Sequence, residues 1–588
     1  MTPTLTTALI APLSSLVVAG PSSSDTLIAT PTVLLSNLPG TPSAQVPGLT
    51  GVEFSPGENT NHFDRIYGHP SGPWILTALA DLPSSRDEVL IASGSLVIQE
   101  GDPAPWTVSE NCGTIDTRCS INASGDLAFA TNTSGTVDDD YVATRIAGTW
   151  GFAAREGELL PGGSGAVLDD TIDSPVILSD GSVGYAADGL DGSATADVDD
   201  DAIVLAGAVL LRKGVTVPPG QSGTSTDRTL DNFDLSDFWA SDNGAQYLVQ
   251  GDLSGSTSSD DVVIVNGAVV LQEGFAVPGS GFVEPIDSSG IKAVSMDASG
   301  HWFARGDNDG TEQDWVVRDG DLIAATGSRV LFGEPELWSD FALDACFFGH
   351  VGNARGDYVI AGMTDNADLS RDAVIVLNGA DVVAREGDPV DLDGNGALDD
   401  DLYFDGFGED DLFLTDALEL YVVATLRNGA GARVGQGLVR IQLRAEVGER
   451  YCDAVPNSLG RSAPLAAYGS PSVAANDLGF VARDLPAFSH VLFMVGTARD
   501  FRGSFGGGEG NLCIGGSIAR FDGPDEVVQT GSGGLACLQA NLSAMPTSGA
   551  SVAVMPGDRM MFQCWYRDVD ANGLQTTNMT NAVDVLFE

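Results

Sequence analysis

The sequence repeats with a period of about 57 residues, and this repeat constrains the fold more than any other feature. Six segments end in an apolar run that leads into a glycine, as in LVIQEGDPAP and VVLQEGFAVPG. Successive glycines lie 53 to 60 residues apart: Gly101, Gly157, Gly214, Gly274, Gly327 and Gly387. Such regularity indicates that one structural unit recurs along the chain and packs against its neighbours.

Two further features recur in phase with these glycines. An acidic loop ends in an aspartate directly before an apolar run, at Asp87, Asp140, Asp201, Asp261, Asp314 and Asp372. Asn266-Gly267 and Asn378-Gly379 each separate two apolar runs, which predicts two-residue hairpin turns because both central residues must take a positive φ. Each unit is therefore predicted to form three or four short antiparallel strands.

A single sheet of this size cannot cover both of its own faces, so neighbouring units must stack. A unit of this length fits a propeller blade with long loops. We therefore predict an all-β protein in which residues 25–448 form a β-propeller-like repeat domain of about seven blades. Segment Thr26–Gly40 would add the outer strand that the last unit, Leu418–Leu443, lacks, and so close the ring. Eight blades and an open array are the alternative arrangements.

The repeat pattern ends near Glu449, where cysteines begin to cluster. Residues 449–588 have the length of one β-sandwich, and runs such as HVLFMVGTA and RMMFQCWYRD are typical of strands. We predict a C-terminal β-sandwich over this segment.

The N-terminal segment resembles a secretory signal. Leu9–Gly20 is a short apolar run that Pro-Ser-Ser-Ser follows, which fits the hydrophobic and cleavage regions of such a signal. We predict a signal peptide over residues 1–24 and a secreted or cell-surface protein. No later apolar run reaches the length of about 18 residues that crosses a bilayer.

Seven cysteines are present, without the spacing of a zinc site, which favours disulfides and an oxidising compartment. Cys112 and Cys119, close together in a Gly/Thr/Ser-rich segment, are the predicted pair, whereas Cys346 is expected to be a buried thiol. The four remaining cysteines allow three connectivities that the sequence does not distinguish: Cys452, Cys513, Cys537 and Cys564.

The net charge limits the partners of the protein. The chain has 82 acidic and 27 basic residues, a formal charge of −55. Nucleic acids and anionic membranes bind through clustered Lys and Arg, so neither is an expected partner. We expect a monomer that binds an extracellular glycan or protein.

The sharpest local motif is the acidic run from Asp391 to Asp401. Oxygen-bearing side chains at positions 1, 3 and 5, a glycine at position 6 and an acid at position 9 match a calcium-binding loop. Leu402 stands where the twelfth ligand is expected, and Asp400 or Asp401 can replace it. The predicted Ca²⁺ ligands are Asp391, Asp393, Asn395, Ala397 through its carbonyl, Asp399 and Asp401. A solvated acidic turn is the alternative, as it is for the weaker run at Asp568–Gly573.

The search for catalytic motifs finds none. The chain has five histidines and lacks His-Glu-x-x-His, Gly-x-Ser-x-Gly, P-loop and dinucleotide motifs. We therefore predict a binding or structural protein without catalytic residues, with calcium as its stabiliser. A polysaccharide- or ester-degrading enzyme with its site in the propeller channel is the alternative, because paired acids suffice for glycoside hydrolysis.

Two sets of motifs resemble known families. The repeated hairpin that ends in Glu-Gly resembles a β-propeller-type repeat of large secreted bacterial proteins of unassigned function. The motifs YCDAVPNSLGRSA, GNLCIGGSIAR, FQCWYRD and NMTNAVDVLF resemble a C-terminal module shared by many secreted proteins of aquatic bacteria. This resemblance implies an appended domain for attachment or sorting, with its first cysteines at Cys452 and Cys513.

Overall fold

The computed structural model describes residues 27–588 apart from a few short loops. These exceptions are residues 58–61, 136, 163–164, 170, 197, 309, 311–312, 332–333, 340–344, 397, 399, 524–525, 531–533 and 571. The predicted signal peptide, residues 1–24, lies outside the described residues.

The described residues form strands, turns and two short 3₁₀ helices, η1 (Pro42–Ala44) and η2 (Phe505–Gly507). The prediction of an all-β protein is therefore confirmed. None of the helices found among these residues is long and apolar enough to span a membrane.

Seven four-stranded antiparallel sheets follow one another along the described part of residues 27–445. The first three consist of β2 (Tyr67–Gly68), β3 (Trp74–Leu79), β4 (Glu88–Ala92) and β5 (Ser95–Gln99); β6 (Cys112–Ile121), β7 (Leu127–Thr133), β8 (Asp140–Ile146) and β9 (Thr149–Arg155); and β11 (Thr171–Ile177), β12 (Val183–Asp188), β14 (Ala202–Leu205) and β15 (Ala208–Arg212). A small hairpin of β10 (Ala166–Val167) and β13 (Asp191–Gly192) accompanies the third sheet.

The next three sheets have the same strand order. They consist of β16 (Leu230–Ala240), β17 (Tyr247–Leu253), β18 (Asp261–Val265) and β19 (Ala268–Gln272); β20 (Ile286–Met296), β21 (Trp302–Asn308), β22 (Trp315–Arg318) and β23 (Asp321–Ala325); and β24 (Phe347–Gly352), β25 (Tyr358–Met363), β26 (Ala373–Leu377) and β27 (Asp381–Arg385). The seventh is built from both ends of this segment: β28 (Leu402–Leu414), β29 (Glu419–Asn428), β30 (Arg433–Ala445) and β1 (Leu27–Ser36).

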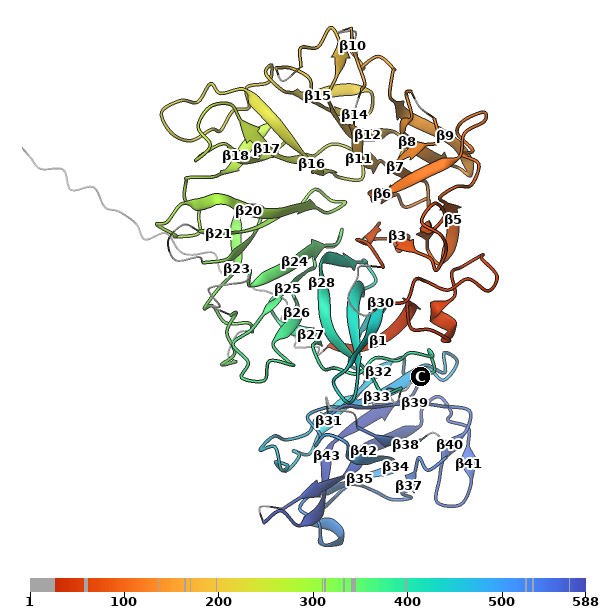
Figure 1. The fold of residues 1–588 in the computed structure, drawn as a ribbon. Helices are drawn as coiled ribbons and strands as arrows, with labels where there is room; N and C mark the ends of the chain where they lie inside the picture. The colour runs from red at the N-terminus through yellow and green to blue at the C-terminus, as the bar shows by residue number, and fades with distance from the viewer. Residues whose placement is uncertain are drawn as a thin grey trace, which may run out of the picture.

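The hydrophobic cores show that these sheets form a closed ring (Figure 1). Each core is shared by two successive sheets; Ile75 of the first sheet, for example, packs in one core with Phe129 of the second. The cycle closes because Leu76 of the first sheet shares a core with Tyr421 and Val423 of the last. Every sheet therefore has both faces covered by its neighbours.

Strand β1 joins the ends of the ring. It pairs antiparallel with β30, from Leu27 opposite Ala445 to Ser36 opposite Gly437, as predicted for Thr26–Gly40. A bulge separates Val33 from Leu35, and these two side chains enter the cores on the two sides of the seventh sheet.

The shared glycines direct the chain from one sheet to the next. All six have φ between 64° and 83°. Their N–H groups donate to a carbonyl in, or in the segment before, the first strand of the following sheet at 2.8–3.0 Å, as Gly101 does to Cys112 and Gly387 to Phe404. The predicted Asn-Gly turns are confirmed, since Asn266 and Asn378 have φ of 51° and 52° and each precedes a glycine with positive φ.

The residue that follows the fourth strand interacts with the acidic loop of the same sheet. The Glu156 carboxylate, after the fourth strand, accepts the main-chain N–H of Asp139 in the acidic loop at 2.9 Å. Lys213 replaces this glutamate in the next sheet and pairs with Asp201 at 3.4 Å. Burial and a neighbouring aspartate raise the pKa of Glu386, in the sixth sheet, to about 7. The repeat therefore uses carboxylates as loop anchors and not only as surface charges.

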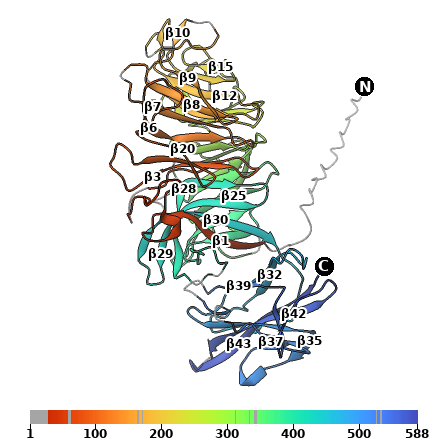
Figure 2. The same cartoon turned by 90° about the vertical axis from the view of Figure 1, so that its right-hand side faces the viewer.

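The C-terminal segment forms separate sheets that contact the ring (Figure 2). A sheet of β32 (Leu465–Gly469), β33 (Leu478–Ala482) and β39 (Ala536–Ala540) shares a core with a larger sheet, and Phe480 lies 4.4 Å from Phe562 between ring centroids. The larger sheet comprises β31 (Glu449–Tyr451), β43 (Gln575–Leu586), β42 (Arg559–Val569), β34 (His490–Gly496), β37 (Ala519–Arg520) and β38 (Val527–Gln529). Two hairpins complete the segment: β35 (Ala498–Arg502) with β36 (Leu512–Gly515), and β40 (Met545–Pro546) with β41 (Ser551–Val552).

The predicted Cys112–Cys119 disulfide is wrong. Both residues lie on β6, opposite Thr133 and Phe129 respectively, near the two ends of one extended strand. A strand rises about 3.3 Å per residue, whereas bonded cysteines need Cα atoms within about 7 Å. The disulfide in the described structure joins Cys452 and Cys513, whose Cα atoms are 6.3 Å apart.

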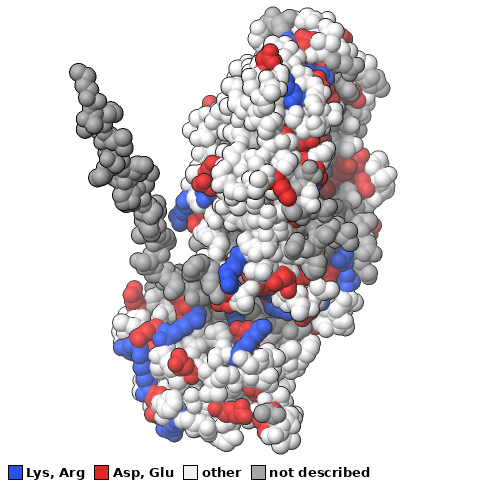
Figure 3. Space-filling model, turned by 90° about the vertical axis from the view of Figure 1, so that its left-hand side faces the viewer, with Lys and Arg blue, Asp and Glu red and all other residues white. Residues whose placement is uncertain are grey.

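The negative charge is concentrated in the ring. Residues 1–448 hold 68 acidic and 19 basic side chains, whereas residues 449–588 hold 14 and 8. On the face in Figure 3, Lys and Arg gather over the lower, C-terminal part and its junction with the ring.

Alanine substitution of two shared glycines tests the turn that links the sheets. A Cβ at Gly274 would lie 2.5 Å from the Ser258 carbonyl oxygen, whereas a Cβ at Gly327 would have no neighbour within 4 Å. Gly327→Ala is expected to destabilise the fold by about 1 kcal/mol through its positive φ alone. Gly274→Ala is expected to cost about 1–3 kcal/mol more, because of the added clash. Urea unfolding measures the free energy of unfolding of both variants. Equal losses of stability would show that the approach of the Ser258 carbonyl to Gly274 does not affect stability.

Candidate functional site

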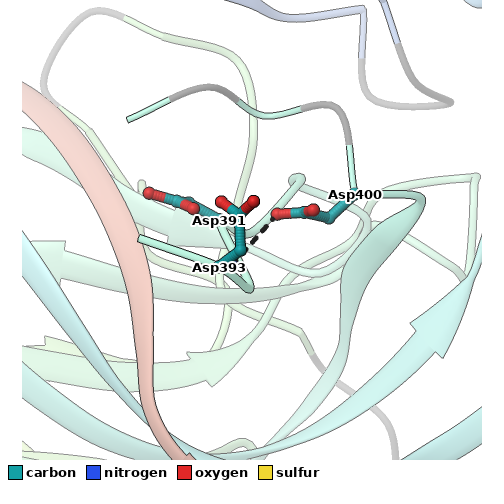
Figure 4. Close-up of side chains that lie close together, drawn as sticks. All are labelled: Asp391, Asp393 and Asp400. Carbon is teal, nitrogen blue, oxygen red and sulfur yellow. Dashed lines mark hydrogen bonds between the residues drawn. The ribbon is translucent and has the colours of Figure 1, made fainter. Parts of the chain in front are cut away.

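The predicted calcium loop lies between β27 and β28. Asp391 is buried, and its two carboxylate oxygens accept the N–H groups of Gly394 at 2.7 Å and Gly396 at 2.9 Å. Asp400 closes the loop, because its carboxylate accepts the N–H of Leu392 at 2.6 Å. Figure 4 shows Asp400 directed toward Asp391 and Asp393.

These aspartates can hold a metal ion. One carboxylate oxygen from each of Asp391, Asp393 and Asp400 lies within 4.8 Å of the others. Burial raises the pKa of Asp391, and the negative charges of Asp400 and Asp393 raise it further, so a cation would relieve their repulsion. Convergent carboxylates are the hard oxygen ligands that Ca²⁺ prefers.

The other predicted ligands lie as follows. Asn395 donates its N–H to the Asp393 carboxylate at 3.0 Å. Asp401 accepts the N–H of Gly429 at 3.0 Å. The cluster contains Asp400 at the place predicted for Asp401. Ala397 and Asp399 lie outside the described residues.

The same loop connects three parts of the chain. The main chain of Asp391 makes two hydrogen bonds to β1. Its N–H donates to the Pro31 carbonyl at 3.1 Å, and its carbonyl accepts from the Val33 N–H at 2.8 Å. Leu398 packs into a core with Tyr468 and Cys537 of the C-terminal sheets. The loop thus touches the closing strand, the seventh sheet and the C-terminal segment.

A second candidate site is the cavity at the centre of the ring. Its volume is about 130 Å³, and the first strand of each of the seven sheets contributes to its lining. These strands are β2, β6, β11, β16, β20, β24 and β28.

Bulges in these strands place polar groups at the cavity. Ser174 of β11 and Asp410 of β28 have φ of 50° and 55° at positions where the pairing register shifts. Both residues line the cavity. Bulges re-aim side chains and are frequent beside binding and active sites.

Two arginines stack on aromatic rings in the cavity. The Arg118 guanidinium lies 4.8 Å from the ring centroid of Trp239 and 5.5 Å from that of Tyr67, and Arg65 lies 5.4 Å from Trp239. These side chains come from the first, second and fourth sheets, so the stack crosses the centre of the ring. Stacking fixes the guanidinium planes and leaves their in-plane N–H groups for hydrogen bonding.

Asp410 lies at the centre of a salt-bridge network. Arg305 donates to its carboxylate at 2.9 Å, and His350 lies 3.7 Å from its other oxygen. Burial alone would raise the pKa of Asp410, but His350, Arg305 and Arg65 hold it well below its usual range. Burial lowers the pKa of His350, although the Asp410 carboxylate opposes this effect.

Two nearby carboxyls behave differently. Burial raises the pKa of Asp411 to about 7, with the charges of Asp410 and Asp64 adding to the effect and Arg65 opposing it. Burial and the Asp116 charge raise the pKa of Asp173 to about 6. An ionised carboxylate that lines the cavity, Asp410, therefore has carboxyls in the neighbouring residues that titrate near neutral pH.

The sequence prediction missed the cavity residues. Their only signal is that charged residues interrupt apolar first strands, as in the run LYFDGFGEDDLFL of β28. Which of them converge depends on ring geometry, because Arg118 and Trp239 lie far apart in the sequence.

His69, Ser71 and Asp242 superficially resemble a nucleophile triad. The Ser71 hydroxyl lies 2.8 Å from His69 Nδ1, and His69 Nε2 lies 3.3 Å from Asp242. The N–H of Ser71 also donates to the same Nδ1, at 3.1 Å. Ser182 and Ser370 make the same pair of contacts to an aspartate two residues earlier, so this arrangement is a local turn.

Larger clefts of about 630 and 570 Å³ lie between the ring and the C-terminal sheets. Both clefts are lined by Glu336 and Arg385, which form a two-point ion pair at 2.9 and 2.7 Å, and by Arg461, which pairs with Asp484 at 3.1 Å. Because these charges already satisfy one another, the clefts give little indication of a ligand.

No protein-family model and no curated protein matches the chain. A neuraminidase-like protein of a flat-faced bat isolate from Peru is 8% identical over 80% of this chain and 86% of that chain, with a TM-score of 0.20. A protein of unknown function from Dyadobacter fermentans is 14% identical over 56% and 94%, with a TM-score of 0.22. A xylan β-1,4-xylosidase from Bacillus halodurans is 9% identical over 90% and 96%, with a TM-score of 0.19. TM-scores this low support no argument about this chain.

The raised pKa of Asp411 predicts a pH dependence of stability. A carboxyl whose folded pKa is about 7 favours the folded state below its unfolded pKa, and this contribution is lost as the pH rises through 7. The melting temperature should therefore fall between pH 5 and pH 8, and Asp411→Asn should reduce that fall. Exposed Asp321→Asn is the control and should leave the pH profile unchanged. A wild-type profile in D411N would show that Asp411 is ionised throughout.

Proposed function

We propose that this chain is an exported binding protein built from a seven-bladed β-propeller, residues 25–448, and a C-terminal β-sandwich, residues 449–588. Seven four-stranded sheets with shared cores support the first part, and two sheets packed face to face support the second. The propeller presents the ligand site, and the sandwich attaches or sorts the protein.

Export after cleavage of a signal peptide agrees with the Cys452–Cys513 disulfide, since such bonds persist in oxidising compartments. The protein is secreted or held at the cell surface as a monomer. Its partner is an extracellular glycan or protein and not a nucleic acid, because the ring carries most of a net charge of −55.

The observation that carries the choice of binding over catalysis is the central cavity. Its volume is about 130 Å³, whereas ligand pockets generally measure about 300–1,000 Å³. An enzyme that cleaves a polymer must hold groups on both sides of the broken bond, and this cavity has room for one small group. Asp410, one of the carboxylates that line the cavity, is committed to Arg305.

Glycan-array binding combined with a hydrolase screen tests this function. The full chain is expected to bind a defined subset of glycans, or a protein partner in a pull-down from the extracellular fraction, without turnover of chromogenic glycosides or esters. Absence of any extracellular partner would contradict the proposal.

One observation favours a second candidate, a hydrolase that removes terminal groups. Asp411 and Asp173, with pKa values of about 7 and 6, can exchange protons near neutral pH. Turnover in the same screen that Asp411→Asn abolishes, with binding retained, would establish this candidate.

We further propose that Ca²⁺ stabilises the ring through Asp391, Asp393 and Asp400. An ion at this loop would fix β1 and the C-terminal sheets together, because the loop bonds to the first and packs on the second.

Removal of calcium is expected to lower the melting temperature. A ligand that binds only the folded state adds about 2.7 kcal/mol at a hundredfold excess over Kd. Asp391→Asn should abolish the difference between calcium and chelator, whereas Asp570→Asn, in the second Asp-x-Asp-type run, should retain it. An identical melt of the wild-type chain in calcium and in chelator would rule out a structural ion.

A further inference from the structure

The walls of the central cavity have balanced charges. Arg305 neutralises Asp410, Arg118 lies 3.7 Å from Asp237, and the nearby Asp410, Asp237 and Asp411 favour the charged form of Arg65. A free anion would therefore meet carboxylates, and a cation would meet guanidinium groups.

Hydrogen bonding in the cavity is not balanced in the same way. Within the described structure, Nε and Nη2 of Arg118, both ring nitrogens of His350 and Nε1 of Trp239 have no hydrogen-bond partner. The Arg118 and His350 side chains are only 7% and 0% exposed, so bulk water does not satisfy them. Oδ1 of Asp410 is a buried acceptor that also lacks a hydrogen bond.

Each buried donor or acceptor that lacks a hydrogen bond destabilises the fold unless a bound group satisfies it. A hydroxyl group both donates and accepts, so it can bond to Arg118 and to Asp410 without adding charge. The stack on Trp239 already fixes the Arg118 plane, which lowers the entropy cost of binding.

The size of the cavity limits the ligand. A cavity of about 150 Å³ in another protein holds one benzene ring. At about 130 Å³, the cavity is slightly smaller than that and has room for the hydroxyl-bearing edge of one sugar ring. Its lining includes His69 and Asp242, whose side chains are partly exposed.

We infer that the central cavity binds the hydroxyl-bearing edge of one uncharged, polyhydroxylated ring, such as a neutral sugar at the end of a glycan. This inference rests on the proposed binding function and specifies its ligand class. Arg118, Trp239 and His350 donate to the sugar oxygens, and Asp410 accepts from a hydroxyl.

The test uses the full chain with methyl glycosides of xylose, glucose, galactose and fucose, with glucuronate and glucosamine as charged counterparts. Ligand-observed NMR and calorimetry measure binding. We expect at least one neutral glycoside to bind more tightly than its charged counterparts. Trp239→Phe, which removes one N–H and keeps an aromatic ring, should weaken binding about threefold to tenfold.

Trp150→Phe is the matched control, because Trp150 lies on the outer strand β9 and should leave the affinity unchanged. Melting curves of both variants show whether the ring is intact. Preference for glucuronate or glucosamine would overturn the neutral class and leave the binding function standing. The inference also fails if no monosaccharide binds while the array finds a partner, since water would then fill the cavity. Failure of both assays would overturn the proposed function itself.

Discussion

The fold depends on each sheet burying its two faces against the sheets beside it. No single sheet has a core of its own, because residues such as Leu76 and Tyr421 contribute to cores that lie between neighbours. This condition is met for all seven sheets only when the first and last are in contact. Leu76 and Tyr421 make that contact, and strand β1 adds to it, since Val33 and Leu35 enter the two cores on either side of the seventh sheet.

Carboxylates have three different roles in this acidic chain. Glu156 and Glu273 anchor the acidic loops, Asp391 and its neighbours form a compact cluster at the ring closure, and Asp410 balances arginines at the centre. Most of the negative charge lies in the ring and not in the C-terminal sheets. At the buried centre of the ring, where arginines stack on aromatic rings, positive and negative charges are paired.

The sequence predicts those features that local geometry determines. Gly387 and Asn378 are recognisable because a positive φ demands particular residues, and β1 because the period leaves one strand missing. The prediction of a Cys112–Cys119 disulfide failed because residues that are close in sequence are held apart when they lie on the same extended strand. The Asp410 bulge is unpredictable, since a register shift depends on both partner strands.

The candidate sites follow the same division. The metal loop is visible in the sequence because its ligands lie within about ten residues. Whether Asp400 or Asp401 joins it depends on the path of the main chain, which sends Asp401 to Gly429. The cavity requires Tyr67, Arg118 and Trp239 to meet across the ring. No local sequence pattern indicates that these three residues are close in space.

The pairing of β1 with β30 also has a consequence for biogenesis. Thr30 donates to the carbonyl of Gln442, 412 residues later. The strand synthesised first must therefore wait, without its partner, until nearly the whole ring has been translated. An unpaired edge promotes aggregation and non-local pairing is slow, so residues 27–36 are the stretch at which the nascent chain is most open to mispairing.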